Sequence, residues 1–114
     1  MNHYLISFPS GAMQIPEGEF QQVVDDSHAV IEEAKAAGVY VFGGGIDEEV
    51  PPVTVAADGT VTEGASSPHT ARLEGGYTVL KLESREQAEE WAARIATACR
   101  CPQELRRFGF DPAS

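Results

Sequence analysis

One stretch of the sequence, residues 73–96, constrains the fold more than any other because its apolar period changes once, from two to about 3.6. Tyr77 and Val79 belong to an aromatic and β-branched run of strand length. Ser84 and Gln87 follow with the spacing of a capping box, in which the hydroxyl accepts the Gln87 amide hydrogen and the Gln87 side chain reaches back to the Ser84 backbone. Apolar residues then recur on one helical face: Ala88, Trp91, Ala92, Ile95, Ala96 and Cys99. The stretch therefore predicts a strand followed by a capped helix, as in an α+β domain.

The rest of the chain supplies similar units on either side. Strands are expected at 3–8, 39–42 and 103–108, and a helix at about 18–37, with Pro16 in its first turn and Gly38 ending it. The run at 39–42 is apolar throughout, which is typical of a central strand buried on both faces. A β-hairpin is expected over 53–62, because Asp58 and Gly59 suit a type I′ turn, and residues 64–72 should form a loop.

The predicted order is β-α-β, an inserted hairpin, and β-α-β. Two such halves form a ferredoxin-like βαββαβ sandwich, with an antiparallel sheet and both helices on one face. The 114 residues leave room for one domain, spanning 1–114. The open face of such a sheet needs cover, so we expect a homodimer with the sheets packed face to face.

The charge balance excludes some partners. Acidic residues outnumber basic ones 18 to 8, and this excess repels phosphate backbones, so nucleic acid is not expected as a partner. No apolar run is long enough for a membrane span, and no signal peptide is recognised at the start. Cys99 and Cys101 are too close in sequence for an easy disulfide, so free thiols and a cytoplasmic location are expected, without a zinc site.

With these elements in view, the chain resembles the YCII-related family, in particular its DGPF-motif branch. The resemblance rests on the Ala-Ala-Gly end of the first helix, the strand into Gly43-Gly44-Gly45, the Asp58-Gly59 hairpin and Gly75-Gly76-Tyr77, which come in the family's order. Where the branch has Thr-Asp-Gly-Pro-Phe, this sequence has Thr-Glu-Gly-Ala-Ser at 62–66. The motif has therefore lost its Pro and Phe.

The resemblance implies a dimeric α+β barrel. That superfamily holds small enzymes such as muconolactone isomerase-like proteins and cofactor-free monooxygenases. Family members of the YCII type resemble enzymes in which a histidine on the first helix is paired with an acidic residue near a cleft. The histidine that matches here is His28, and Glu63 occupies the position of the motif's aspartate.

His28 lies between Val24 and Ile31 at helical spacing, which predicts a place on the apolar face of the first helix. Burial would favour its neutral form, which could act as a base, with a carboxylate to orient it. Glu63 is the first choice of acidic partner, and Asp47 and Asp58 are alternatives. The competing interpretation is a buried histidine whose hydrogen bond to a backbone carbonyl is purely structural.

Three further residues are candidates for ligand contact. His69 lies in the loop after Pro68, and Tyr40 and Tyr77 lie on strands that would line a barrel cavity. An exposed, idle histidine and two buried, hydrogen-bonded tyrosines are the alternatives. Histidines without paired spacing give no metal site, and no cofactor is expected.

Two functional hypotheses remain open. One is a cofactor-free lyase or isomerase of small molecules, in which His28 and an acidic partner transfer a proton. The other is a non-catalytic dimeric module that binds a small ligand or serves a regulatory role. The sequence leaves the substrate and the reaction open.

Overall fold

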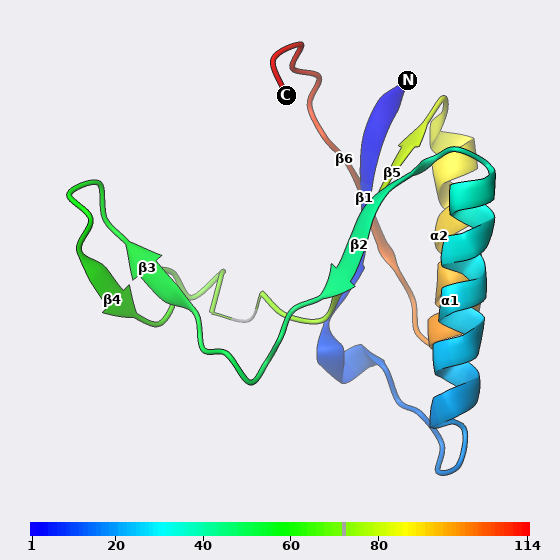
Figure 1. The fold of residues 1–114 in the computed structure, drawn as a ribbon, viewed down its shortest axis with the longest axis horizontal. Coiled ribbons are helices and arrows are strands. Elements are labelled where there is room, and N and C mark those ends of the chain that lie inside the picture. Colours follow the sequence, from blue (N-terminus) through cyan, green and yellow to red (C-terminus); the bar gives the residue numbers. More distant parts are fainter. Residues whose placement is uncertain (72) are drawn as a thin grey trace.

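The computed structural model describes residues 1–71 and 73–114 (Figure 1). Secondary structure is distributed along the chain as follows: β1 (Asn2–Phe8), the short 3-10 helix η1 (Ser10–Ala12), α1 (Phe20–Ala36), β2 (Tyr40–Gly45), β3 (Val53–Val55), β4 (Val61–Glu63), β5 (Gly76–Leu82), α2 (Arg85–Cys99) and β6 (Glu104–Arg107). No helix in this part of the chain has both the length and the apolar character needed to cross a bilayer.

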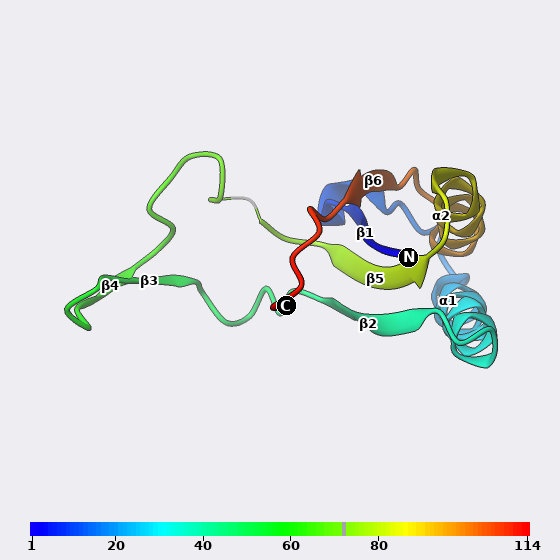
Figure 2. The same ribbon diagram turned by 90° about the horizontal axis from the view of Figure 1, so that it is seen from above.

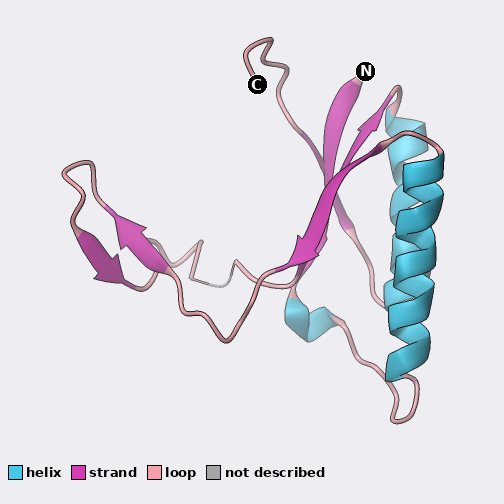
Figure 3. Cartoon of the chain, in the orientation of Figure 1, coloured by secondary structure: helices cyan, strands magenta, loops and turns pink. Residues whose placement is uncertain are grey.

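The main sheet has the strand order β2-β5-β1-β6, and every neighbouring pair is antiparallel. Both long helices lie on one side of it (Figures 2 and 3), with α2 against β5 and β6 and α1 against α2 and β2. This order, with β1 and β5 in the centre, is that of a ferredoxin-like α+β sandwich. The fold class expected from the sequence is therefore confirmed.

The side chains that face the helices form the core. Ile6 and Leu80 are fully buried there, and Tyr4, Leu82, Ala88 and Ala92 join them. The opposite face of the sheet carries the alternate residues, among them Leu5, Val79 and Lys81. The described helices leave that open face without a covering layer (Figure 2).

The prediction that 39–42 is a central strand is wrong. β2 lies at the edge of the sheet, and Val41 and Phe42 are 49% and 67% exposed. The register shifts between Tyr40 and Phe42, so Tyr40 pairs with Leu80 on the helix side while Phe42 pairs with Val79 on the open side. The apolar side chains of β2 are therefore divided between the two faces of the sheet. Only the face towards the helices is covered by another layer.

The first helix begins later than its sequence indicates. Pro16 accepts a hydrogen bond from the Glu19 amide in a turn, and α1 starts at Phe20, which is exposed. Val23 and Ala34 are its buried residues. Gly38, at φ +75°, ends the helix in the left-handed conformation as expected.

The capping box of α2 is present with one difference. The Ser84 hydroxyl accepts the Gln87 amide hydrogen at 3.2 Å, as the sequence predicts. The Gln87 side chain, however, accepts from the backbone amide of Glu83 rather than of Ser84, at 3.0 Å. The Gln87 amide, one of the orphan donors at the start of the helix, is thereby satisfied.

Residues 46–75, which we call the arm, leave the sheet between β2 and β5 and end in the β3-β4 hairpin. The hairpin is confirmed, but its turn is not type I′, since Gly59 has positive φ and Asp58 does not. The Gly59 amide donates to the Ala56 carbonyl, which makes this a type I turn followed by a left-handed glycine. Of the loop expected at 64–72, the last residue lies outside the described residues, and the strand expected from 73 begins at Gly76.

Candidate functional site

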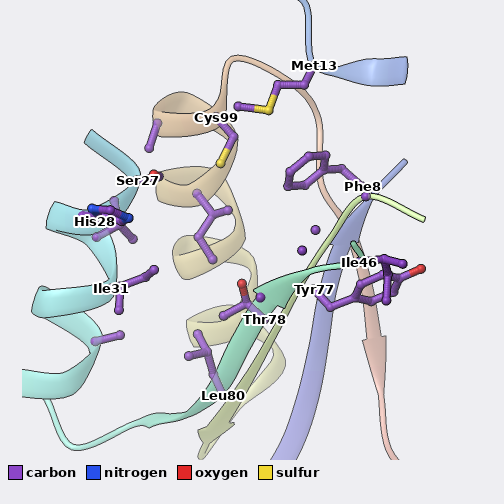
Figure 4. Close-up of a pocket in the computed structure, with 18 of the residues that line it drawn as sticks. Phe8, Met13, Ser27, His28, Ile31, Ile46, Tyr77, Thr78, Leu80 and Cys99 are labelled. Carbon is purple, nitrogen blue, oxygen red and sulfur yellow. The ribbon is translucent and has the colours of Figure 1, made fainter. Parts of the chain in front are cut away.

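A cavity of about 410 Å³ lies between the helices and the sheet, at the end of the sheet where the arm begins. Figure 4 shows His28 and Ile31 of α1 on one side of it and Tyr77 and Ile46 on the other, with Cys99 of α2 between them. The cavity therefore draws its walls from both layers of the sandwich. We refer to it as the pocket.

Most of the pocket wall is apolar. The contributing side chains come from both helices and three strands and include Phe8, Ile31, Ala34, Leu80, Trp91 and Ile95. Small-molecule sites are commonly of this size, with apolar walls and a few polar groups that fix orientation. Water bound here would find few partners, which favours a ligand with apolar surface.

Some polar side chains of the pocket already form hydrogen bonds within the chain, and others do not. The Ser27 hydroxyl donates to the Val24 carbonyl at 2.9 Å, and the Tyr77 hydroxyl donates to the Glu74 carbonyl at 3.4 Å. Five polar side chains of the lining make no hydrogen bond with other described residues: Ser10, His28, Tyr40, Glu48 and Thr78. These are the groups that remain available to a ligand.

Cys99 is a neutral part of the wall. Its side chain is buried, and burial raises the pKa of its thiol, with the neighbouring Cys101 adding to the increase and Arg100 opposing it. Burial also raises the pKa of the Cys101 thiol, although its hydrogen bond with Gln103 opposes this. A thiolate is needed for nucleophilic attack, so neither cysteine is arranged as a nucleophile.

The structure gathers three of the five predicted site residues. His28, Tyr40 and Tyr77 all line the pocket. Glu63 is on β4 of the hairpin and His69 is in the following segment of the arm, and neither lines the pocket of its own chain. The two alternative acids, Asp47 and Asp58, also lie on the arm.

One expectation about His28 is wrong. Its helical spacing predicts the buried face of α1, but the side chain is exposed at the edge of the pocket. The helix packs through Val23 and Ala34, which turns His28 towards the rim instead of the core. The histidine therefore touches both solvent and pocket, and it is not a core residue.

Sequence reasoning missed Glu48 as a pocket residue. It follows β2 by three residues, at the start of the arm, and it lines the same pocket as His28. The sequence suggests its neighbour Asp47 as an alternative acid, because no periodic pattern distinguishes the three acids at 47–49. Thr78 was missed as well, although its alternation with Leu80 on β5 indicates the helix side of the sheet.

A second cavity, of about 560 Å³, lies on the open face of the sheet under the C-terminal segment. It is lined by His3, Val79, Lys81, Phe108 and Phe110, among others. Although it is larger, it is formed by an exposed tail lying against a sheet rather than by two packed layers. Among residues 1–71 and 73–114, no three His, Cys, Asp or Glu side chains come together as metal ligands.

Comparisons with known proteins give one solved structure to report. No protein-family model matches the chain, and no curated protein matches it. The solved structure that resembles this chain is that of another protein, 5-chloro-2-hydroxyhydroquinone dehydrochlorinase (TftG) from Burkholderia phenoliruptrix AC1100, in complex with 2,5-dihydroxybenzoquinone. It is 15% identical, with a TM-score of 0.48, over 97% of this chain and 97% of that chain. The fold assignment given above rests on this chain's own strand order and helix placement.

Proposed function

We propose that this protein acts on a small, mostly apolar molecule held in the pocket, with His28 transferring a proton and no cofactor taking part. The observation that carries the proposal is the placing of an uncommitted imidazole at the rim of an apolar cavity. A base in such a place can reach a bound molecule while the walls keep water away from it. This activity belongs to the lyase and isomerase class.

An acidic partner for His28 is part of the proposal. Glu48 shares the pocket with His28 and makes no hydrogen bond to other described residues, which makes it the partner within one chain. Glu63, the residue at the DGPF aspartate position, lies on the arm and serves His28 only if the arm of another chain brings it there. The order of the motifs in the sequence supports membership of the YCII-related family.

We also propose a homodimer that forms through the open face of the sheet. Phe42 and Val79 pair on that face, and Phe42 is left 67% exposed. Packing a second sheet on them would remove this apolar surface from water. A cytoplasmic location is proposed with it, because the cysteines are unpaired.

Proton transfer can be tested without knowing the natural substrate. Coumaranone, the lactone of ortho-hydroxyphenylacetic acid, has an apolar ring and an acidic C–H beside its carbonyl. In D₂O, a base that removes this proton leaves an enolate, and the return of a deuteron labels the carbon. We expect the wild-type protein to accelerate the exchange and His28→Gln to lose most of the acceleration, by roughly a hundredfold or more for a positioned general base.

Binding is measured in the same samples through Trp91, which is the one tryptophan of the chain and lines the pocket. Its fluorescence should change on titration with coumaranone in both wild type and His28→Gln. Glu48→Gln and Glu63→Gln then decide between the two acids, because only the true partner should slow the exchange while leaving binding intact.

The alternative is a non-catalytic binding module. The position of Glu63 on the arm, away from the pocket of its own chain, favours it. Binding of coumaranone by the wild type without any acceleration of exchange would establish this alternative. Absence of binding would overturn both functions for this pocket.

A further inference from the structure

The arm extends well beyond the body of the molecule (Figures 1 and 2). The radius of gyration is 15.9 Å, whereas a compact chain of this length has a value of about 13 Å. The arm leaves the sheet on the side opposite to the helices, as the view in Figure 2 shows. An isolated two-stranded hairpin in that position is marginally stable in water and needs a surface to pack against.

The chain also exposes more surface than a monomer of its size should. Its accessible surface is 7991 Å², whereas a compact monomer of 12.2 kDa exposes about 6,100 Å². The excess of about 1,900 Å² is within the roughly 1,000–2,500 Å² that each subunit of an obligate homodimer buries. The area therefore matches a large interface that the single chain leaves uncovered.

The hairpin at the end of the arm has an apolar face and a polar face. In its register Val53 pairs with Glu63 and Val55 with Val61, so these side chains share one face, which we call the valine face. Thr54 and Thr62 pair on the other. The three valines are 54–61% exposed, so the apolar valine face is in contact with water instead of packing against another layer.

Charge indicates which surface the arm meets. The sequence of the arm, residues 46–75, contains six acidic residues and one basic residue. The open face of the sheet carries Lys81 on β5, opposite His3 of β1. It also carries Arg106 on β6, whose guanidinium forms a 2.7 Å ion pair with Glu104 of the same strand. An acidic arm complements Lys81 and His3 on the partly apolar open face of the same chain when two copies meet about a twofold axis.

We propose that two copies of this chain exchange arms: the open faces pack together, and each arm crosses onto the other copy with its valine face inward. This inference rests on the proposed function, because it also assigns the exchange a role in the pocket. The two ends of the arm line the pocket through Ile46, Glu48 and Gly75, and the Ile46 amide donates to the Gly75 carbonyl at 2.8 Å. When the arm packs on a second copy, its two ends are held in place. One wall of the pocket is then held in place as well.

The test uses two variants with the same change of charge on opposite faces of the hairpin. Val55→Lys places a cation on the valine face, whereas Thr62→Lys places one on the threonine face and is the control. Sedimentation equilibrium at matched concentrations should give a dimer for wild type and for Thr62→Lys. For Val55→Lys the dissociation constant should rise roughly tenfold or more, as for an unpaired charge in an interface core.

The rate of hydrogen exchange at the Ile46 amide reports how firmly this wall of the pocket is held, and the measurement needs no ligand. We expect faster exchange in Val55→Lys than in Thr62→Lys at a concentration where only the control is dimeric. Should circular dichroism show that Val55→Lys is unfolded, Val61→Lys on the neighbouring strand replaces it. A monomeric wild type, or equal dimerisation and equal Ile46 protection in the two lysine variants, would overturn the proposal.

Failure of the proposed pocket function can be distinguished from failure of arm exchange by measuring coumaranone binding and dimerisation in the same variants. If coumaranone fails to bind the wild type while the lysine variants behave as expected, arm exchange stands and the pocket's assigned ligand class is wrong. If coumaranone binds wild type and Val55→Lys equally and both are monomers, the pocket function stands and arm exchange is wrong.

Discussion

His28 carries the chemistry proposed for this protein while contributing little to its packing. Its side chain is exposed, and it has no hydrogen bond with the residues that the structure describes. His28→Ala should therefore change the free energy of unfolding by no more than about 0.5 kcal/mol. Urea denaturation at matched protein concentration measures this, because the stability of a dimer depends on concentration.

Val23 on the same helix provides the comparison for His28. It is 1% exposed, so Val23→Ala should cost about 2 kcal/mol through lost burial and the cavity left behind. A loss of about 1–3 kcal/mol in His28→Ala would mean that the imidazole satisfies a structural partner. The histidine would then be held for folding, and its assignment as the base would be wrong.

Gly75 is required by the close approach of two backbones at the root of the arm. Its φ is +96°, and a Cβ there would meet the Phe8 carbonyl oxygen and lie 2.9 Å from Pro9 Cα. Gly59, at φ +90°, has open space around it. Gly75→Ala should therefore cost about 1–3 kcal/mol more than Gly59→Ala, since both are strained but only the first collides. Equal changes in thermal unfolding would show that the root can relax.

At this scale the sequence indicates residue types better than it indicates orientations. The spacing of Val24, His28 and Ile31 was enough to assign a helix, but the face that packs is set by α2 and the sheet, which no local pattern describes. The same holds for Glu48, one of three consecutive acids of which one lines the pocket. Which acid faces inward depends on the path of the arm root.

At the scale of elements, an ion pair joins the two helices. Arg100, which caps α2 at φ 61°, donates from Nη2 to Asp26 Oδ2 of α1 at 2.9 Å. A hydrogen bond from Gln22 lowers the pKa of the Asp26 carboxyl below its ordinary 3.8, and the Arg100 guanidinium lowers it further. The charged carboxylate is thus favoured in the folded state.

This pair gives a pH dependence of known sign. Because the folded pKa of Asp26 is below its unfolded value, its contribution is present above pH 3.8 and is lost as pH falls through the folded value. Asp26→Asn should thus be less stable than wild type at pH 7, and the difference should shrink as the pH falls below 3.8 and through the folded pKa of Asp26. Asp25→Asn is the control, as Asp25 accepts a hydrogen bond only from Gln21 of its own helix. A difference that persists in acid would assign the effect to packing.

The elements themselves were largely predictable because each has a local signal. The period change at Ser84, the glycine at 38 and the Asp58-Gly59 turn all coincide with observed boundaries or turns. The position of β2 was not predictable in the same way. A run of apolar residues indicates burial on both faces, and it does not tell whether a neighbouring strand or a second chain provides the cover.

At the scale of the whole molecule, the open face and the arm are two parts of one feature. The hairpin could be recognised from its turn, yet its extension away from the sheet could not, since local pairing does not determine where a hairpin packs. The valine face and the pairing of Phe42 with Val79 both leave apolar surface exposed in the single chain. The proposed second copy would cover both with one interface.

The proposed function depends on the pocket between the helices and the sheet being the site where a ligand binds. The most direct measurement is a titration of the full chain with coumaranone, in which the amide NMR spectrum of the protein is recorded at each step. We expect the amide shifts to change at three pocket residues, His28, Ile46 and Thr78. They should stay constant at residues of the second cavity: His3, Lys81 and Phe110. Changes confined to the second cavity, or no change at all, would contradict the proposed function.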